Sequence, residues 1–120
     1  MLPYVIHADP GGMIEYYIEE RAELEHQGRQ IVIDGMCASA CTILAMSPNA
    51  CATDRAVLGF HRASFDPDGA EASPRGTAYL EKAYTPGIRS WLRSRGGLTP
   101  IMKWLSGRDL FRFVRRCEDT

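Results

Sequence analysis

The chain has 120 residues, of which 45% are hydrophobic and 24% are charged, and its formal net charge is −1 with neutral histidines. This length and balance predict one folded domain over residues 1–120 and exclude intrinsic disorder and collagen-like repeats. The longest mainly apolar stretch, 36–46, is shorter than the roughly 20 residues that cross a bilayer, so we expect no membrane span. The first residues lack a basic start and a long apolar run, which argues against a secretory signal.

Charge is divided unevenly along the chain. Residues 1–60 carry 3 basic and 8 acidic side chains, whereas residues 61–120 carry 11 basic and 7 acidic ones. The basic excess includes Arg112, Arg115 and Arg116, but nucleic-acid binding usually needs a strongly basic surface with stacking aromatics. We therefore expect a solvated helix face there and no nucleic-acid partner.

Strand and helix patterns alternate in the first half of the chain. Val5 and Ile6 begin a strand that ends at the turn 9–12, where proline and glycine favour tight backbone conformations. Apolar residues recur near a 3.6-residue period over 13–27, which predicts a helix with one buried face. The remaining predicted elements are a strand at 30–33, a helix of small residues at 39–46, and short strands near Cys51 and at 57–60. This order predicts an α/β fold with parallel strands joined by right-handed crossovers.

The second half predicts a loop followed by helices. Residues 62–76 hold two turn motifs and few large apolar side chains, so we expect an exposed loop there. Helical patterning follows, centred on 79–84, 88–92, 101–105 and 109–116. Trp91 and Trp104 fall on these patterns and are expected to anchor the core.

The four cysteines give no C-x-x-C pair, so neither a zinc site nor a thioredoxin-like site is expected, and we predict no metal or other cofactor. They are Cys37, Cys41, Cys51 and Cys117. One or two disulfides in an oxidising compartment, or buried free thiols, both fit this pattern. The sequence leaves the pairing open.

Chemistry is suggested by three strand ends that a parallel arrangement brings to one edge of the sheet. Ser39 stands where a strand turns into a helix, close to backbone N–H groups that lack intrahelical partners. His61 ends a later parallel strand and is expected to take the serine proton as a general base. The glycines that end the first strand would offer N–H groups as an oxyanion hole. The alternative for Ser39 is an ordinary helix N-cap.

Four motifs occur in order along residues 3–113. They are Asp9-Pro10-Gly11-Gly12, Gly35-x-x-x-Ser39, Gly59-Phe60-His61 and Arg108-Asp109-Leu110-Phe111. These resemble the Ser-Pro-Gly-Gly turn, the Gly-x-Ala-Ala-Ser nucleophile motif, the strand-ending histidine and the Arg-Asp-x-Phe stretch of the Clp-type serine peptidases. That family belongs to the wider crotonase-like superfamily, so the resemblance implies a Clp-peptidase-like domain with a parallel sheet and crossover helices.

The resemblance implies a role for each matched residue. Ser39 would be the nucleophile, His61 the general base, and Asp109 the carboxylate that orients the imidazole. The implied oxyanion donors are the N–H groups of Gly11 and Ala40, with Gly12 at the bound substrate. For Asp109, the alternative is an N-cap of the last helix.

The implied function is a serine peptidase-like hydrolase that acts on a peptide or protein substrate without a cofactor. A homo-oligomer is expected, because Clp-type peptidases assemble into rings and this short chain would otherwise leave a sheet edge bare.

Two features depart from the family. Cys37 and Cys41 flank Ser39, which looks more like small bacterial Clp-like proteins described as periplasmic or secreted. We therefore expect a periplasmic or secreted location, with a cytoplasmic one as the alternative. Only about eight residues precede the glycine turn, whereas the family's first strands and helix precede it, so we expect the N-terminal part of the fold to be missing.

Other interpretations of the function stay open at this point. One is a catalytically inactive Clp-like protein that binds an extended peptide or serves in assembly. Another is a crotonase-type acyl-CoA enzyme, for which the sequence shows no acidic pair at the expected places. A Ser/Lys dyad would need Lys82 or Lys103, and neither lies in a recognisable motif.

Overall fold

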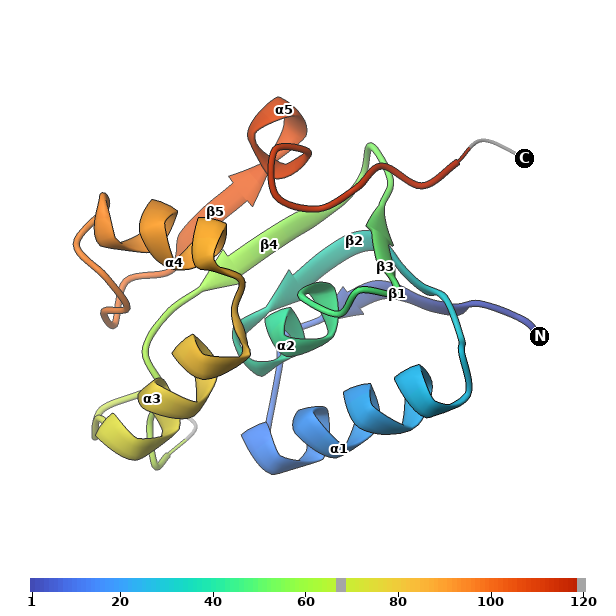
Figure 1. Cartoon of the computed structure of the whole chain (residues 1–120). Coiled ribbons are helices and arrows are strands. Elements are labelled where there is room, and N and C mark those ends of the chain that lie inside the picture. Colours follow the sequence, from blue (N-terminus) through green and yellow to red (C-terminus); the bar gives the residue numbers. More distant parts are fainter. Residues whose placement is uncertain (67–68, 119–120) are drawn as a thin grey trace.

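In the computed structural model, which describes residues 1–66 and 69–118, five strands form one mixed sheet with helices packed against it (Figure 1). The elements in chain order are β1 (Tyr4–Asp9), α1 (Ile14–His26), β2 (Ile31–Ala38), α2 (Thr42–Ala45), β3 (Ala50–Ala52), β4 (Val57–Phe60), α3 (Pro74–Ala83), α4 (Pro86–Arg93), β5 (Lys103–Ser106) and α5 (Gly107–Leu110). A 3₁₀ turn, Ser39–Cys41, joins β2 to α2. The α/β class predicted from the sequence is confirmed.

The sheet is parallel where the predicted site residues lie. β2 pairs in parallel with β1 on one side and with β3 and β4 on the other, β3 beside its first half and β4 beside its second. β5 is antiparallel to β4, so the strand order is β1-β2-β4-β5. The carboxyl ends of β1, β2 and β4 therefore meet at one edge of the sheet, at Asp9, Ala38 and Phe60.

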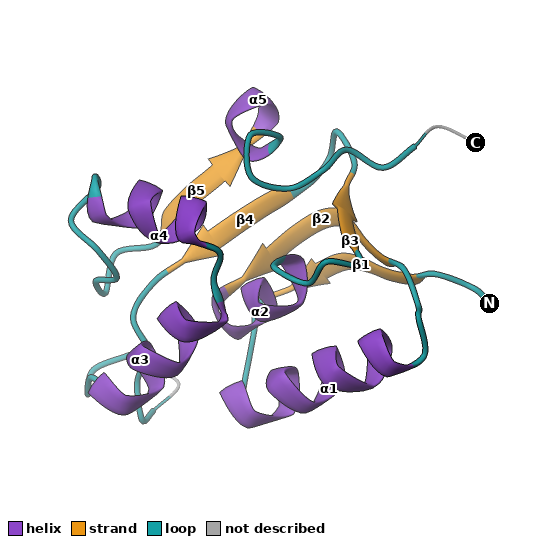
Figure 2. Ribbon diagram, in the orientation of Figure 1, coloured by secondary structure: helices purple, strands orange, loops and turns teal. Residues whose placement is uncertain are grey.

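Helices α1 to α4 cover one face of the sheet (Figure 2). Along β2, buried side chains alternate with partly exposed ones: Ile31, Ile33 and Cys37 are buried, and Val32, Asp34 and Met36 are partly exposed. This alternation is typical of a strand with one covered face. The helical side chains in the core include Tyr17, Leu24, Leu44, Leu80, Ile88 and Trp91.

Two disulfides lie towards opposite ends of the sheet. Cys37–Cys41 joins the end of β2 to the 3₁₀ turn, with Cα atoms 5.3 Å apart, and Cys51–Cys117 joins β3 to the C-terminal segment, with Cα atoms 4.8 Å apart. The pairing that the sequence left open is thereby given, and the hypothesis of free thiols is wrong. Among the described residues, no helix is long and apolar enough to cross a membrane.

The largest difference from the sequence predictions is at 101–105, where a strand replaces the predicted helix. β5 pairs with β4 through Leu58↔Leu105 and Gly59↔Trp104. Leu105 is 2% exposed and Trp104 is 53% exposed, so the segment alternates with the period of a strand. Trp104 is therefore not the core anchor that was predicted, whereas the prediction for Trp91 is confirmed.

Three other predicted segments are shorter or differently divided than expected. The loop predicted at 62–76 ends where α3 begins, because Ser73 accepts a hydrogen bond from the Gly76 N–H and caps the helix. Two residues of that loop, Pro67 and Asp68, lie outside the described residues. The helix predicted at 39–46 is divided into the 3₁₀ turn and α2, and the one predicted at 109–116 holds only the end of α5.

Candidate active site

Ser39 occupies a sharp turn at the end of β2. Its φ of +55° makes it the only non-glycine residue with a positive φ in the part of the chain that the structure describes. Residues with a Cβ rarely adopt this conformation, and such strain is typical of functional sites. Strand, strained serine and helical turn together have the geometry of a nucleophile elbow. The N-cap alternative is wrong, because Ala38 holds that position and no side chain caps the turn.

The glycine turn after β1 lies directly against this elbow. Gly11 has a φ of +95°, and a Cβ built on it would lie 2.7 Å from both the Ala38 carbonyl oxygen and the Ser39 Cβ. Asp9 fixes the turn, because its Oδ1 accepts hydrogen bonds from the Gly11 N–H at 2.9 Å and the Tyr17 hydroxyl at 2.7 Å. Burial and this hydrogen bond raise the pKa of Tyr17, so its hydroxyl stays protonated and donates.

Two backbone N–H groups near Ser39 remain available to a ligand. The Ala40 N–H belongs to the first turn of a helical segment, where N–H groups lack an intrahelical acceptor. The Gly12 N–H has no hydrogen-bond partner among the described residues. The Gly11 N–H, predicted as an oxyanion donor, is instead bonded to Asp9. The N–H groups left available to a ligand are therefore those of Gly12 and Ala40.

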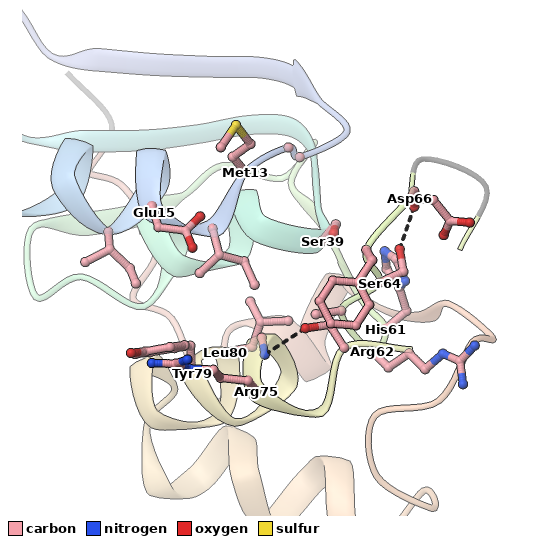
Figure 3. Close-up of a pocket in the computed structure, with 18 of the residues that line it drawn as sticks. Met13, Glu15, Ser39, His61, Arg62, Ser64, Asp66, Arg75, Tyr79 and Leu80 are labelled. Atoms are coloured by element: carbon pink, nitrogen blue, oxygen red, sulfur yellow. Dashed lines mark hydrogen bonds between the residues drawn. The ribbon is translucent and has the colours of Figure 1, made fainter. Parts of the chain in front are cut away.

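Ser39 and His61 line one cleft of about 1310 Å³, together with the glycine turn (Figure 3). His61 follows β4 directly, and the pairing of Ala38 with Gly59 holds the ends of β2 and β4 side by side. Burial lowers the pKa of His61 from its ordinary value of 6.5, because a partly desolvated site disfavours the charged imidazolium. The imidazole is therefore mainly neutral at pH 7, which is the form that accepts a proton.

The walls of the cleft combine apolar and charged side chains from α1, α3 and the segment after β4. Large apolar side chains that the structure leaves exposed gather here: Met13, Ile18, Phe65 and Tyr79. The charged wall residues are Glu15, Glu19, Arg62, Asp66 and Arg75. Exposed apolar surface concentrated in a cleft that also contains polar groups is typical of a binding site.

Asp109 does not lie at this site. β5 is antiparallel to β4, so it begins at the cleft edge of the sheet and ends at the opposite edge. α5, which carries Asp109, follows there, beside the amino end of β4, whereas His61 follows the carboxyl end of β4 (Figure 1). The Asp109 side chain is 68% exposed, and its carboxylate is 3.9 Å from the Arg112 guanidinium. The N-cap alternative is also wrong, because Ser106 holds that position in α5.

The serine and the histidine share a cleft without forming a complete triad. Among the described residues, no side-chain hydrogen bond joins Ser39 to His61. In the same described part of the chain, no ion pair or side-chain hydrogen bond joins a carboxylate to the imidazole, and burial is the cause of its lowered pKa. Catalytic hydrogen bonds are often long or misaligned before substrate binds, so this geometry is compatible with a Ser–His pair.

The lysines do not supply a substitute base. Lys103 Nζ donates to the Gly97 carbonyl at 2.6 Å and to the Thr99 hydroxyl at 2.9 Å, and Lys82 does not line the cleft. Within the described residues, no three side chains of the kinds that bind metals gather in one place.

Sequence reasoning missed the support beneath the elbow. Thr42 Oγ1 donates to the Ser39 carbonyl at 2.6 Å and lies 2.6 Å from the Tyr84 hydroxyl, and both side chains are buried. A threonine three residues after the serine is a local signal for the first contact. No local signal connects Tyr84 to it, because the two residues are 42 positions apart.

No protein-family model matches this chain, and no curated protein sequence matches it significantly. The fold and the cleft therefore define only a class: an α/β domain whose parallel strand ends place an elbow serine, a histidine and free backbone N–H groups together.

Proposed function

We propose that this chain is a serine hydrolase similar to the Clp-type peptidases, with Ser39 as the nucleophile and His61 as the general base. The strained elbow carries the proposal, because Ser39 holds a φ of +55° in the cleft that also contains His61 and the glycine turn. Such a conformation persists only where the surrounding structure compensates for its cost, and these positions cluster at active sites. The finer assignment to a Clp-like, crotonase-like fold is part of this proposal.

In the proposed reaction, Ser39 Oγ attacks the carbonyl carbon of a peptide bond while its proton passes to His61. The N–H groups of Gly12 and Ala40 stabilise the oxyanion that forms. The imidazolium then gives its proton to the departing amine as the C–N bond breaks. A water molecule, deprotonated by neutral His61, hydrolyses the acyl-enzyme and restores the serine. The lowered pKa of His61 supports this role, because the base is neutral at pH 7.

The walls of the cleft support a peptide or protein substrate. Met13, Phe65 and Tyr79 offer exposed apolar surface to an apolar side chain of the substrate, and the charged residues of the cleft wall offer polar contacts. None of the proposed steps requires a cofactor.

We also propose a periplasmic or secreted location and a homo-oligomeric assembly. Two disulfides support the location, because such bonds persist in oxidising compartments and are rare in a reducing cytosol. Edge strands at both sides of the sheet, β1 and β5, support the assembly, since unpaired strand edges are places where further chains can pair.

A fluorophosphonate probe tests the hydrolase proposal, because it phosphonylates activated serines. We expect the wild-type chain to be labelled, and Ser39→Ala and His61→Ala to lose the label. Ser106→Ala and His26→Ala are matched controls, since both side chains are exposed and neither lines the cleft. Equal labelling of the wild type and Ser39→Ala would rule out the proposal.

A second candidate function is an inactive protein whose cleft only holds an extended peptide. The imidazole of His61 favours it, since no ion pair or hydrogen bond to a carboxylate holds that side chain among the described residues. Binding of fluorescent peptides with apolar side chains separates the two candidates. Under this second candidate, Ser39→Ala keeps the wild-type peptide affinity and the wild type shows no phosphonylation.

A further inference from the structure

The peptide group between Ser39 and Ala40 carries both a hydrogen-bond acceptor and a proposed oxyanion donor. A trans peptide group is planar, so the Ser39 carbonyl and the Ala40 N–H point in opposite directions. Any contact that fixes the carbonyl also fixes the direction of the N–H. The Ala40 nitrogen lies on the side of the glycine turn, 2.9 Å from where a Cβ on Gly11 would be. The carbonyl accepts hydrogen bonds from both the backbone N–H and the side-chain hydroxyl of Thr42.

Counting protons gives the direction of the next hydrogen bond. The Thr42 hydroxyl has one proton, and the Ser39 carbonyl receives it because a carbonyl only accepts. The 2.6 Å contact between the Thr42 and Tyr84 hydroxyls must then have Tyr84 as its donor. Burial raises the pKa of Tyr84, so this hydroxyl keeps its proton at neutral pH. The result is a chain of donors from Tyr84 through Thr42 to the Ser39 carbonyl.

The surroundings of Thr42 and Tyr84 hold these two hydroxyl groups rigidly in place. Thr42 is 0% exposed and Tyr84 is 3% exposed, so water has little access to either hydroxyl. The Tyr84 ring packs edge-on against Phe60, with ring centroids 5.3 Å apart, and Phe60 directly precedes His61. Hydrogen bonds in a buried chain also polarise one another, which strengthens the last bond to the carbonyl.

We propose that Thr42 and Tyr84 are positioning residues, which act by aiming the Ala40 N–H at the oxyanion of the reaction proposed above. The inference therefore rests on the proposed function. A threonine that bonds to a carbonyl three residues earlier is common in helical turns. A buried tyrosine hydroxyl from the end of another helix has no such local explanation, and it contributes the donor that leaves the threonine proton for Ser39.

Two substitutions, Tyr84→Phe and Thr42→Val, remove the hydroxyls of this Tyr84–Thr42 hydrogen-bond relay with little change in side-chain shape. We expect the rate of fluorophosphonate labelling, measured per folded molecule, to fall about tenfold in Tyr84→Phe and further in Thr42→Val. Each loss is smaller than the roughly 10²- to 10³-fold fall in rate that follows removal of a whole oxyanion donor. Thr42→Ser restores the hydroxyl and is expected to regain most of the rate. Tyr16→Phe, which changes an exposed tyrosine on α1, is expected to label like the wild type. The probe concentration that gives half of the maximal labelling rate should be unchanged, because the relay acts on the reaction and not on binding of the probe.

A second measurement separates this inference from the proposed function. The NMR shift of the Ala40 amide proton reports its environment whether or not the chain is an enzyme, and we expect it to move in Tyr84→Phe but not in Tyr16→Phe. Labelling of folded Tyr84→Phe at the wild-type rate overturns the inference. If the wild type itself is not labelled, the proposed function fails and the NMR measurement alone tests the relay. An Ala40 amide shift that is the same in Tyr84→Phe as in the wild type then overturns the relay, and a changed shift supports it.

Discussion

The two ends of the sheet differ in how they hold the chain, although each has a disulfide. At the cleft end, strand ends, a glycine at positive φ and the Cys37–Cys41 disulfide surround Ser39 and fix its backbone. At the opposite end, α5 and the C-terminal segment are tied to the sheet by Cys51–Cys117 and by the ion pair of Arg116 with Asp54. The first end constrains local geometry and the second attaches a distant segment. Changes at the first should therefore act on labelling, and changes at the second on stability.

Gly11→Ala is expected to have the largest effect on the cleft end. The added Cβ would meet the Ala38 carbonyl at 2.7 Å, so the glycine turn must move away from the elbow. We expect probe labelling to fall about 100-fold or more, as when an oxyanion donor is lost.

Gly96→Ala provides the matched control for that substitution. Gly96 also has a positive φ, +88°, but nothing lies within 4 Å of its added Cβ. The change is expected to cost about 1 to 2 kcal/mol of unfolding free energy and to leave labelling of the folded protein unchanged. Equal losses of labelling in the two variants would contradict the distinction between strain at the site and strain elsewhere.

The pH dependence of labelling tests whether His61 is the base. Below its pKa, the rate should fall about tenfold for each pH unit, because the neutral imidazole is consumed. Burial lowers the pKa of His61, so the midpoint is expected below 6.5 and the rate should be level at pH 7. A midpoint above 6.5 would be wrong for an isolated, partly buried imidazole and would indicate a carboxylate acting on it.

Removing the disulfides one at a time compares the two ends directly. The bonds join cysteines separated by 4 positions and by 66 positions. Loop-closure entropy then predicts losses of about 2 kcal/mol for Cys37→Ala with Cys41→Ala and about 4 kcal/mol for Cys51→Ala with Cys117→Ala. Urea unfolding measures these losses. We expect only the first pair to lower labelling per folded molecule, by severalfold, because it alone spans Ser39. The opposite ranking of labelling would show that the elbow does not need its cross-link.

The cleft end was predictable because its signals are local. A proline and glycine turn after a strand, a serine between a strand and a small-residue helix, and a histidine directly after a short apolar strand are each visible in a few adjacent residues. The parallel order of the strands then brings their carboxyl ends together. Ser39, His61 and the glycine turn do line one cleft.

The parts of the fold and of the site that the sequence did not predict depend on contacts between distant residues, which short sequence patterns do not carry. The apolar residues at 101–105 fit a helix and a strand equally over so short a segment, and pairing with β4 selects the strand. The Asp9 carboxylate accepts a hydrogen bond from the Gly11 N–H, and this side-chain contact decides which N–H of the glycine turn is left free. The strand at β5 also reverses the chain, so the motif around Asp109 arrives at the wrong end of the sheet.

The smallest expected difference in labelling rate is between substitutions of two aspartates, one at each end of the sheet. Asp9→Asn weakens the hydrogen bonds that hold the glycine turn, and loss of about 1 kcal/mol there corresponds to about fivefold slower labelling. Asp109→Asn changes an exposed carboxylate beyond the far end of β4, so its labelling rate should stay within about twofold of the wild type. Loss of labelling in folded Asp109→Asn would contradict this, since within one chain the carboxylate cannot reach His61. A second copy of the chain, or a different arrangement of α5, would then have to bring it to the imidazole.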